Sequence, residues 1–73
     1  MSADRVRHIA AIYPGTFDPV HFGHIDIIQR SAELFGTVVV GVYDRPLKSL
    51  VFSFEDRIAL VHEAVRELGT DNV

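Results

Sequence analysis

The chain has 73 residues, of which 48% are apolar and 23% charged, and its formal net charge is −3. That length allows one small domain, and the lack of a basic stripe argues against nucleic acid as a partner. The chain has no cysteine, which excludes disulfides and thiolate metal sites and fits a cytoplasmic protein. No apolar run approaches the roughly 20 residues of a membrane helix. We therefore expect a cytoplasmic globular protein with neither nucleic acid nor membrane as a partner.

The first predicted element is a strand over residues 9–13, a continuous apolar run that ends at Pro14 and Gly15. Continuous apolarity is typical of a strand that is buried on both faces. A helix is predicted over residues 23–35, and Gly36 is expected just past its C-terminal cap. The apolar residues of this segment recur at helical spacing, at Ile25, Ile28, Ala32 and Phe35.

A second strand is predicted over residues 37–43, which are rich in β-branched side chains, and a loop follows over residues 44–49. Ser53 and Asp56 resemble a capping box at the start of a second helix, and Gly69 is expected to end it. The apolar face of that helix holds Ile58, Val61, Val65 and Leu68. Residues 71–73 have the character of an approach to a third strand.

The order β-α-β-α predicts an α/β fold in which the two strands are parallel. We expect half of a doubly wound, Rossmann-like sheet, with both faces covered by helices and the edges bare. The pattern stops midway, so residues 1–73 are interpreted as a single partial domain. Bare edges of a small sheet favour self-association, and we expect a homo-oligomer.

The segment from Tyr13 to His24 joins the first strand to the first helix. A helix start offers unpaired N–H groups and positive potential, and both favour a phosphate. Gly15 lets the backbone approach a ligand closely, and Thr16 offers a hydroxyl group and an N–H. From Gly15 and Thr16 alone, a turn that needs glycine only for its shape is the more common interpretation.

His21 and His24 lie three residues apart, so they project from one face of the helix start. Two imidazole donors beside a positive helix end suit the charge that develops on a phosphate during transfer. The alternatives are a histidine metal pair and a helix capped by Asp18 with incidental histidines. For Asp18 we favour the capping role over a place near a metal-bound nucleotide.

Lys48 lies in the loop after the second strand. In a parallel sheet that loop opens on the same edge as the first turn, where ligands bind, so Lys48 is a candidate phosphate contact. A solvated surface lysine is the alternative, and Arg45 has the same two interpretations. Arg57 is interpreted, with Glu55 and Asp56, as a charge at a helix start.

The segment Gly15–His24 resembles the nucleotidyltransferase superfamily that carries a histidine–x–glycine–histidine signature. Four further segments narrow the resemblance to the phosphopantetheine adenylyltransferase family: Tyr13–Pro19, His24–Arg30, Arg45–Lys48 and Phe52–Arg57. The resemblance runs from about Ile9 to Val73 and covers the first half of that family's usual domain.

The resemblance implies transfer of adenylate from ATP to 4′-phosphopantetheine, giving dephospho-coenzyme A and pyrophosphate with the help of Mg²⁺. It implies that Thr16 contacts substrate phosphate, that His24 steadies the α-phosphate and that Lys48 holds phosphate in the transition state. Thr16, Phe17 and Lys48 are the implied substrate-binding residues, Phe17 through its backbone. The implied ATP-binding residues are Gly15, Thr16, Phe17, His21 and His24.

Two features differ from the family pattern. His21 stands where many members carry threonine or another small residue, and it resembles the two-histidine form of sister families. The chain also lacks the family's second half, which supplies an arginine and a serine-rich segment for the nucleotide. The alternatives are a half-domain that folds or self-associates without catalysis, a cytidylyltransferase, or a nicotinamide mononucleotide adenylyltransferase.

Overall fold

The computed structural model describes residues 6–44 and 49–73 of the chain. Four elements follow one another: β1 (Val6–Gly15), α1 (Phe22–Leu34), β2 (Phe35–Val42) and α2 (Phe54–Leu68). The two strands pair in parallel, in a register that runs from Ala10 opposite Thr37 to Gly15 opposite Val42. The prediction of a β-α-β-α chain with parallel strands, the first half of a Rossmann-like nucleotidyltransferase fold, is confirmed.

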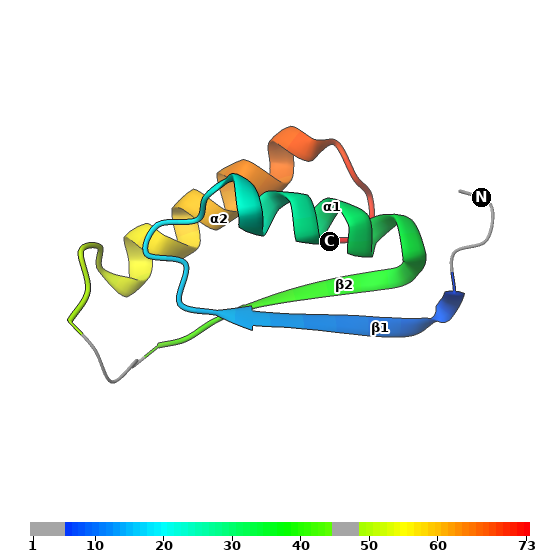
Figure 1. Ribbon diagram of the computed structural model, residues 1–73, viewed down its shortest axis with the longest axis horizontal. Helices are drawn as coiled ribbons and strands as arrows, with labels where there is room; N and C mark the ends of the chain where they lie inside the picture. Colours follow the sequence, from blue (N-terminus) through cyan, green and yellow to red (C-terminus); the bar gives the residue numbers. More distant parts are fainter. Residues whose placement is uncertain (1–5, 45–48) are drawn as a thin grey trace.

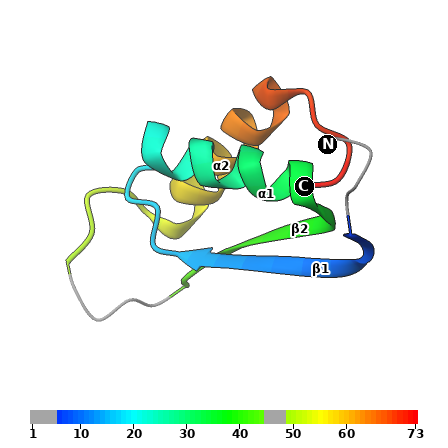
Figure 2. The ribbon, with the colours of Figure 1, turned by 45° about the vertical axis from the view of Figure 1, so that its right-hand side comes forward.

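Both helices lie on the same face of the two-stranded sheet (Figures 1 and 2). The expectation that helices cover both faces is therefore wrong for the described residues. On the uncovered face Ile12 is 72% exposed and Val39, its partner across the ladder, is 49% exposed. The continuous apolarity of these strands indicates burial on two sides, but within the described residues only one side is covered.

The helix ends follow from local chemistry, with one difference from expectation. The expected stop at Gly36 is wrong, because α1 ends at Leu34 and passes straight into β2, with Phe35 as an extended C-cap. Because the chain goes directly from helix to strand, no residue in a left-handed conformation is needed to end α1, and Gly36 is the second residue of β2. The α2 prediction is confirmed: Ser53 accepts a hydrogen bond from the Asp56 N–H, and Gly69 ends the helix at a left-handed φ of 71°.

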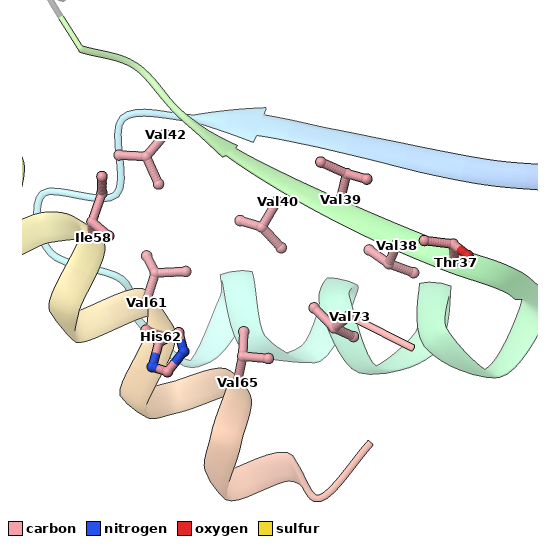
Figure 3. Close-up of a pocket in the computed structure, with 10 residues that line it drawn as sticks. All are labelled: Thr37, Val38, Val39, Val40, Val42, Ile58, Val61, His62, Val65 and Val73. Carbon is pink, nitrogen blue, oxygen red and sulfur yellow. The ribbon is translucent and has the colours of Figure 1, made fainter. Parts of the chain in front are cut away.

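The core lies between the sheet and the helices. Its buried apolar residues are Phe17, Ile28, Ala32, Val38 and Val61. Alternation along β2 sends Val38 and Val40 toward the helices and Val39 away from them (Figure 3). An apolar groove of about 480 Å³ remains beside β2 and α2. We call it the β2 groove, and it is lined by Thr37, Val38, Val39, Val40, Val42, Ile58, Val61, His62, Val65 and Val73.

The C-terminal residues lie along the outer edge of β2, on the side away from β1. The Asn72 carbonyl accepts a hydrogen bond of 2.8 Å from the Val38 N–H. The Asn72 side-chain amide holds this position by donating to the Ala32 and Phe35 carbonyls, each at 2.9 Å. Residues 71–73 are not part of the described sheet, and they approach the edge of β2 through this one backbone hydrogen bond.

Candidate functional site

A polar cleft lies where the turn after β1 enters α1, at the carboxyl end of the sheet. It has a volume of about 440 Å³ and is lined by Thr16, Phe17, Asp18, Pro19, His21, His24 and Ser49. Of the residues predicted to bind ligand, Thr16, Phe17, His21 and His24 line this cleft, and Gly15 is the last residue of β1 before it. Lys48 and Arg45 lie outside the described residues, and Ser49, next to Lys48, lines the cleft.

Phe17 forms the base of the turn. It is 2% exposed and has a left-handed φ of 52°, a conformation that costs an aromatic residue about 1–3 kcal/mol. Its ring packs edge-on against His24, with centroids 4.7 Å apart, and against Tyr13, with centroids 5.6 Å apart. A Cβ atom on Gly15 would lie 2.9 Å from the Phe17 Cζ. Glycine is thus required at this position because the buried ring passes directly over it.

The two histidines cap the start of α1. His21 is the N-cap residue, and its Nδ1 accepts a hydrogen bond of 3.1 Å from the Gly23 N–H. The His24 Nδ1 accepts in return from the His21 N–H, also at 3.1 Å, which completes a capping box. The rings stack with centroids 3.7 Å apart. The expectation that Asp18 caps this helix is wrong, because His21 occupies the cap.

This capping decides which nitrogen of each ring faces a ligand. A nitrogen that accepts a hydrogen bond carries no proton, so each neutral ring carries its proton on Nε2. Burial lowers the pKa of His24 below its ordinary value of 6.5, and the neighbouring His21 ring lowers this pKa further. Near neutral pH His24 is therefore a neutral Nε2–H donor.

The electrostatics of the helix start favour an anion. The first turn of α1, which is fully described, contains no acidic residue that would offset the positive end of the helix dipole. Gly23 contributes by its small size, since a Cβ there would lie 3.0 Å from the His21 Cε1 and would push the capping ring aside. The cleft therefore combines the positive end of a helix with imidazole donors, an arrangement that favours phosphate.

Asp18 joins the turn to the segment before α2. Its Oδ2 accepts a hydrogen bond of 2.7 Å from the Val51 N–H, and its Oδ1 accepts one of 2.8 Å from the Phe52 N–H. The carboxylate is thus committed to backbone donors. Sequence spacing pointed to the nearest helix start, whereas the fold brings a distant loop within reach of the side chain.

Arg57 was not identified as a site residue from the sequence. It has no exposed surface, and its guanidinium donates to the carbonyls of Thr16, Tyr43 and Phe52. Arg57 does lie at a helix start, as interpreted, but its side chain is buried and bound to carbonyls, which was not predicted from the sequence. One signal was available: Arg57 lies four residues before Val61, which places it on the buried stripe of α2.

Magnesium is commonly held by one or two carboxylates together with substrate phosphates and water, so few protein ligands are needed for it. No group of three or more histidine, cysteine or acidic side chains suited to a metal occurs in residues 6–44 and 49–73. The one carboxylate in the cleft, Asp18, is engaged by two backbone N–H groups, and imidazole is a poor magnesium ligand. In the same part of the chain, no helix has the length and apolarity needed to cross a membrane.

Phosphopantetheine adenylyltransferases of several organisms are similar in sequence to most of this chain. A phosphopantetheine adenylyltransferase of Roseiflexus sp. is 53% identical over 58 residues, which are 80% of this chain and 36% of that protein. One of Gloeobacter violaceus is 51% identical over 63 residues, 86% of this chain and 38% of that protein. One of Haemophilus influenzae is 48% identical over 64 residues, 88% of this chain and 41% of that protein. The chain thus spans between 36% and 41% of the length of these relatives.

The resemblance noted from the motifs is therefore confirmed. A family model described as cytidylyltransferase-like matches residues 12–73. This match contains the whole polar cleft with its capped histidines, both helices and β2. Because it covers most of the chain, the chain belongs to the cytidylyltransferase-like family.

Proposed function

We propose that the chain is the phosphate-binding part of a phosphopantetheine adenylyltransferase, which transfers the adenylyl group of ATP to 4′-phosphopantetheine. The relatives described above carry that name. The observation that carries the proposal is the mutual capping of His21 and His24, which leaves two Nε2 donors at a helix start without acidic residues. Donors of this kind stabilise charge that develops on a phosphate.

The chemistry of this transfer suits the residues of the cleft. The attacking group is a phosphate anion, so no general base is required, and positioning with charge stabilisation supplies most of the catalysis. We assign His24 to the α-phosphate, with Thr16 as a contact to substrate phosphate and the Phe17 backbone as a contact to the nucleotide. Lys48 as a phosphate ligand remains a prediction from the resemblance.

We infer that residues 1–73 are a single partial domain. Support comes from the uncovered sheet face at Ile12 and Val39, the open β2 groove and the share of its relatives that the chain spans. A half-domain that folds without catalysis is the alternative for the isolated chain. Association through free sheet edges, a cytoplasmic location and assistance by Mg²⁺ remain predictions.

Two substitutions at residue 24 test the role of the histidine pair. In His24→Asn the side-chain oxygen takes the place of Nδ1 and keeps the helix cap, but the Nε2 donor is lost. His24→Gln keeps a donor near the Nε2 position and loses the cap acceptor. We expect His24→Asn to weaken ATP binding about tenfold or more, since a hydrogen bond to a charged group contributes about 1.5–3 kcal/mol. His24→Gln should retain more of the binding.

The measurement is an NMR titration of the isotope-labelled chain with ATP. His62→Gln is the matched control, because His62 is exposed and borders the β2 groove, not the polar cleft. The amides of Thr16, Phe17, Gly23 and His24 should shift together. Wild-type affinity in His24→Asn would refute the assignment. Equal binding of CTP, or stronger binding of nicotinamide mononucleotide than of 4′-phosphopantetheine, would favour the sister activities.

A further inference from the structure

We infer that Arg57 is a positioning residue for phosphate binding: its buried guanidinium orients the Thr16–Phe17 peptide so that the Phe17 N–H faces the cleft. This inference rests on the proposed function, because it concerns how the cleft receives a phosphate. Arg57 lies in the first turn of α2, outside the cleft lining. It acts through the turn and does not touch the ligand.

One side chain joins three separate parts of the chain. The Arg57 Nη1 donates to the Thr16 carbonyl at 2.8 Å and to the Tyr43 carbonyl at 2.9 Å, and its Nε donates to the Phe52 carbonyl at 3.3 Å. These carbonyls belong to the turn after β1, the residue after β2 and the segment before α2. A planar guanidinium can make these contacts together because its N–H donors point in several fixed directions, like a fork. A lysine ammonium lacks this arrangement.

The contact with the Thr16 carbonyl has a consequence for the next N–H. The only cis peptide bond in the described residues is Asp18–Pro19, so the Thr16–Phe17 bond is trans. In a trans peptide the C=O and the following N–H point in opposite directions. With its carbonyl held against Arg57, this peptide turns the Phe17 N–H away from Arg57, toward the side where Thr16 and Phe17 line the cleft.

Two further observations fit this role. Within residues 6–44 and 49–73 the Phe17 N–H donates to no backbone carbonyl. Phe17 also holds a left-handed φ of 52°, and a strained conformation persists only where its surroundings hold it. Arg57 holds the carbonyl side of this residue, while Tyr13 and His24 hold its ring.

Arg57 also brings a permanent positive charge behind the turn. Guanidinium does not lose its proton in proteins, and the Arg57 Nη2 is buried without a hydrogen-bond partner among the described residues. A buried charge is screened less than an exposed one, so it raises the potential where a phosphate would bind. Arg57 thus contributes to both the direction of the donor and the attraction of the anion.

The experiment compares Arg57→Lys, which keeps the charge and loses the fork, with Arg57→Met, which loses both. Arg66→Lys and Arg66→Met are the matched controls, because Arg66 lies exposed on the same helix and pairs with Glu63. Each labelled variant is titrated with ATP and followed by NMR, after circular dichroism has established its helix content. The observed quantities are the affinity and the separate shifts of the Phe17, Gly23 and His24 amides.

We expect Arg57→Lys to lose more than about half of the ATP-induced shift at Phe17 while Gly23 and His24 keep theirs, with affinity falling about threefold. In Arg57→Met the affinity should fall about tenfold, because this variant loses the charge as well as the fork. A merely structural role would weaken all three signals together, and that outcome would overturn the inference. A wild-type Phe17 shift in Arg57→Lys would overturn it as well.

If the Arg57 variants do not fold, the wild-type chain decides. The Arg57 Nε–H signal should then shift on ATP addition with the same affinity as the Phe17 amide, and a constant signal would refute the inference. If the wild-type chain binds no ATP, both the proposed function and this inference are refuted. If the wild-type chain binds ATP and the Arg57 variants bind it with the same affinity and the same amide shifts, only this inference is refuted.

Discussion

The polar cleft and the β2 groove are hollows of similar size, about 440 and about 480 Å³, but they are built in different ways. Around the cleft, side chains satisfy backbone groups: His21 and His24 at the helix start and Asp18 at the loop line it, and Arg57 lies behind the turn. The β2 groove is lined mainly by valines, and within residues 6–44 and 49–73 the free edge of β2 is met by one hydrogen bond, to the Asn72 carbonyl.

The difference shows which of the two hollows has its geometry fixed by contacts within the described residues. The cleft residues already have partners, and directional hydrogen bonds hold their geometry. The β2 groove depends on apolar contact, which has no preferred direction, and it stays open at one side. This contrast agrees with the proposal that the residues form the phosphate-binding part of a larger domain.

The largest expected effect lies beside the β2 groove. Val38 is 2% exposed and faces the helices, whereas Val39 is 49% exposed on the opposite face. Val38→Ala should lower the free energy of unfolding by about 2 kcal/mol, through lost burial and the cavity left behind. Val39→Ala should change it by less than about 0.5 kcal/mol. Urea unfolding measures both, and equal losses would mean that the bare face is covered in solution.

A smaller effect is expected under the cleft. Gly15→Ala would place a Cβ 2.9 Å from the buried Phe17 ring and force it against Tyr13 and His24, at a cost of about 1–2 kcal/mol. Gly41→Ala is the control, since its Cβ would meet only the Pro14 Cα, at 3.9 Å. Thermal unfolding compares the two variants. If Gly41→Ala lost as much stability, the tight packing above Gly15 would not be the cause.

The smallest effect is the response of the helix cap to pH. Folding lowers the pKa of His24 below its ordinary value of 6.5. As pH falls below 6.5, the unfolded chain therefore binds a proton at His24 before the folded chain does. The contribution of His24 to stability is therefore complete above about pH 6.5 and declines as pH falls through the lowered folded pKa. In His24→Asn this decline should be absent, and urea titrations at about pH 5.5 and pH 7.5 compare it with the wild type.

At about pH 8, where His24 is neutral in the folded and unfolded states, wild type and His24→Asn should respond equally to a further small rise in pH. A wild-type stability that does not change between the acidic and neutral measurements would contradict the lowered pKa. A decline of the same size in His24→Asn would assign the pH response to another group.

Local patterns were sufficient for much of the fold. Apolar spacing predicted α1 and α2 to within a residue or two, and Ser53 and Gly69 marked the ends of α2. The glycine-threonine turn and the paired histidines located the cleft. These features depend on residues close together in the chain, where geometry follows directly from spacing.

The sequence by itself determined the order of the elements, the parallel pairing and the grouping of Thr16, Phe17, His21 and His24 at one helix start. Only the tertiary structure decided that both helices share one face, that Asp18 binds the Val51 and Phe52 amides, and that Arg57 reaches the Thr16 carbonyl. The physical reason is range. Caps and turns are set by neighbours along the chain. The Val51 and Phe52 partners of Asp18 lie 33 and 34 residues away, and the Thr16 partner of Arg57 lies 41 residues away, so these groups meet only once the sheet and helices have packed.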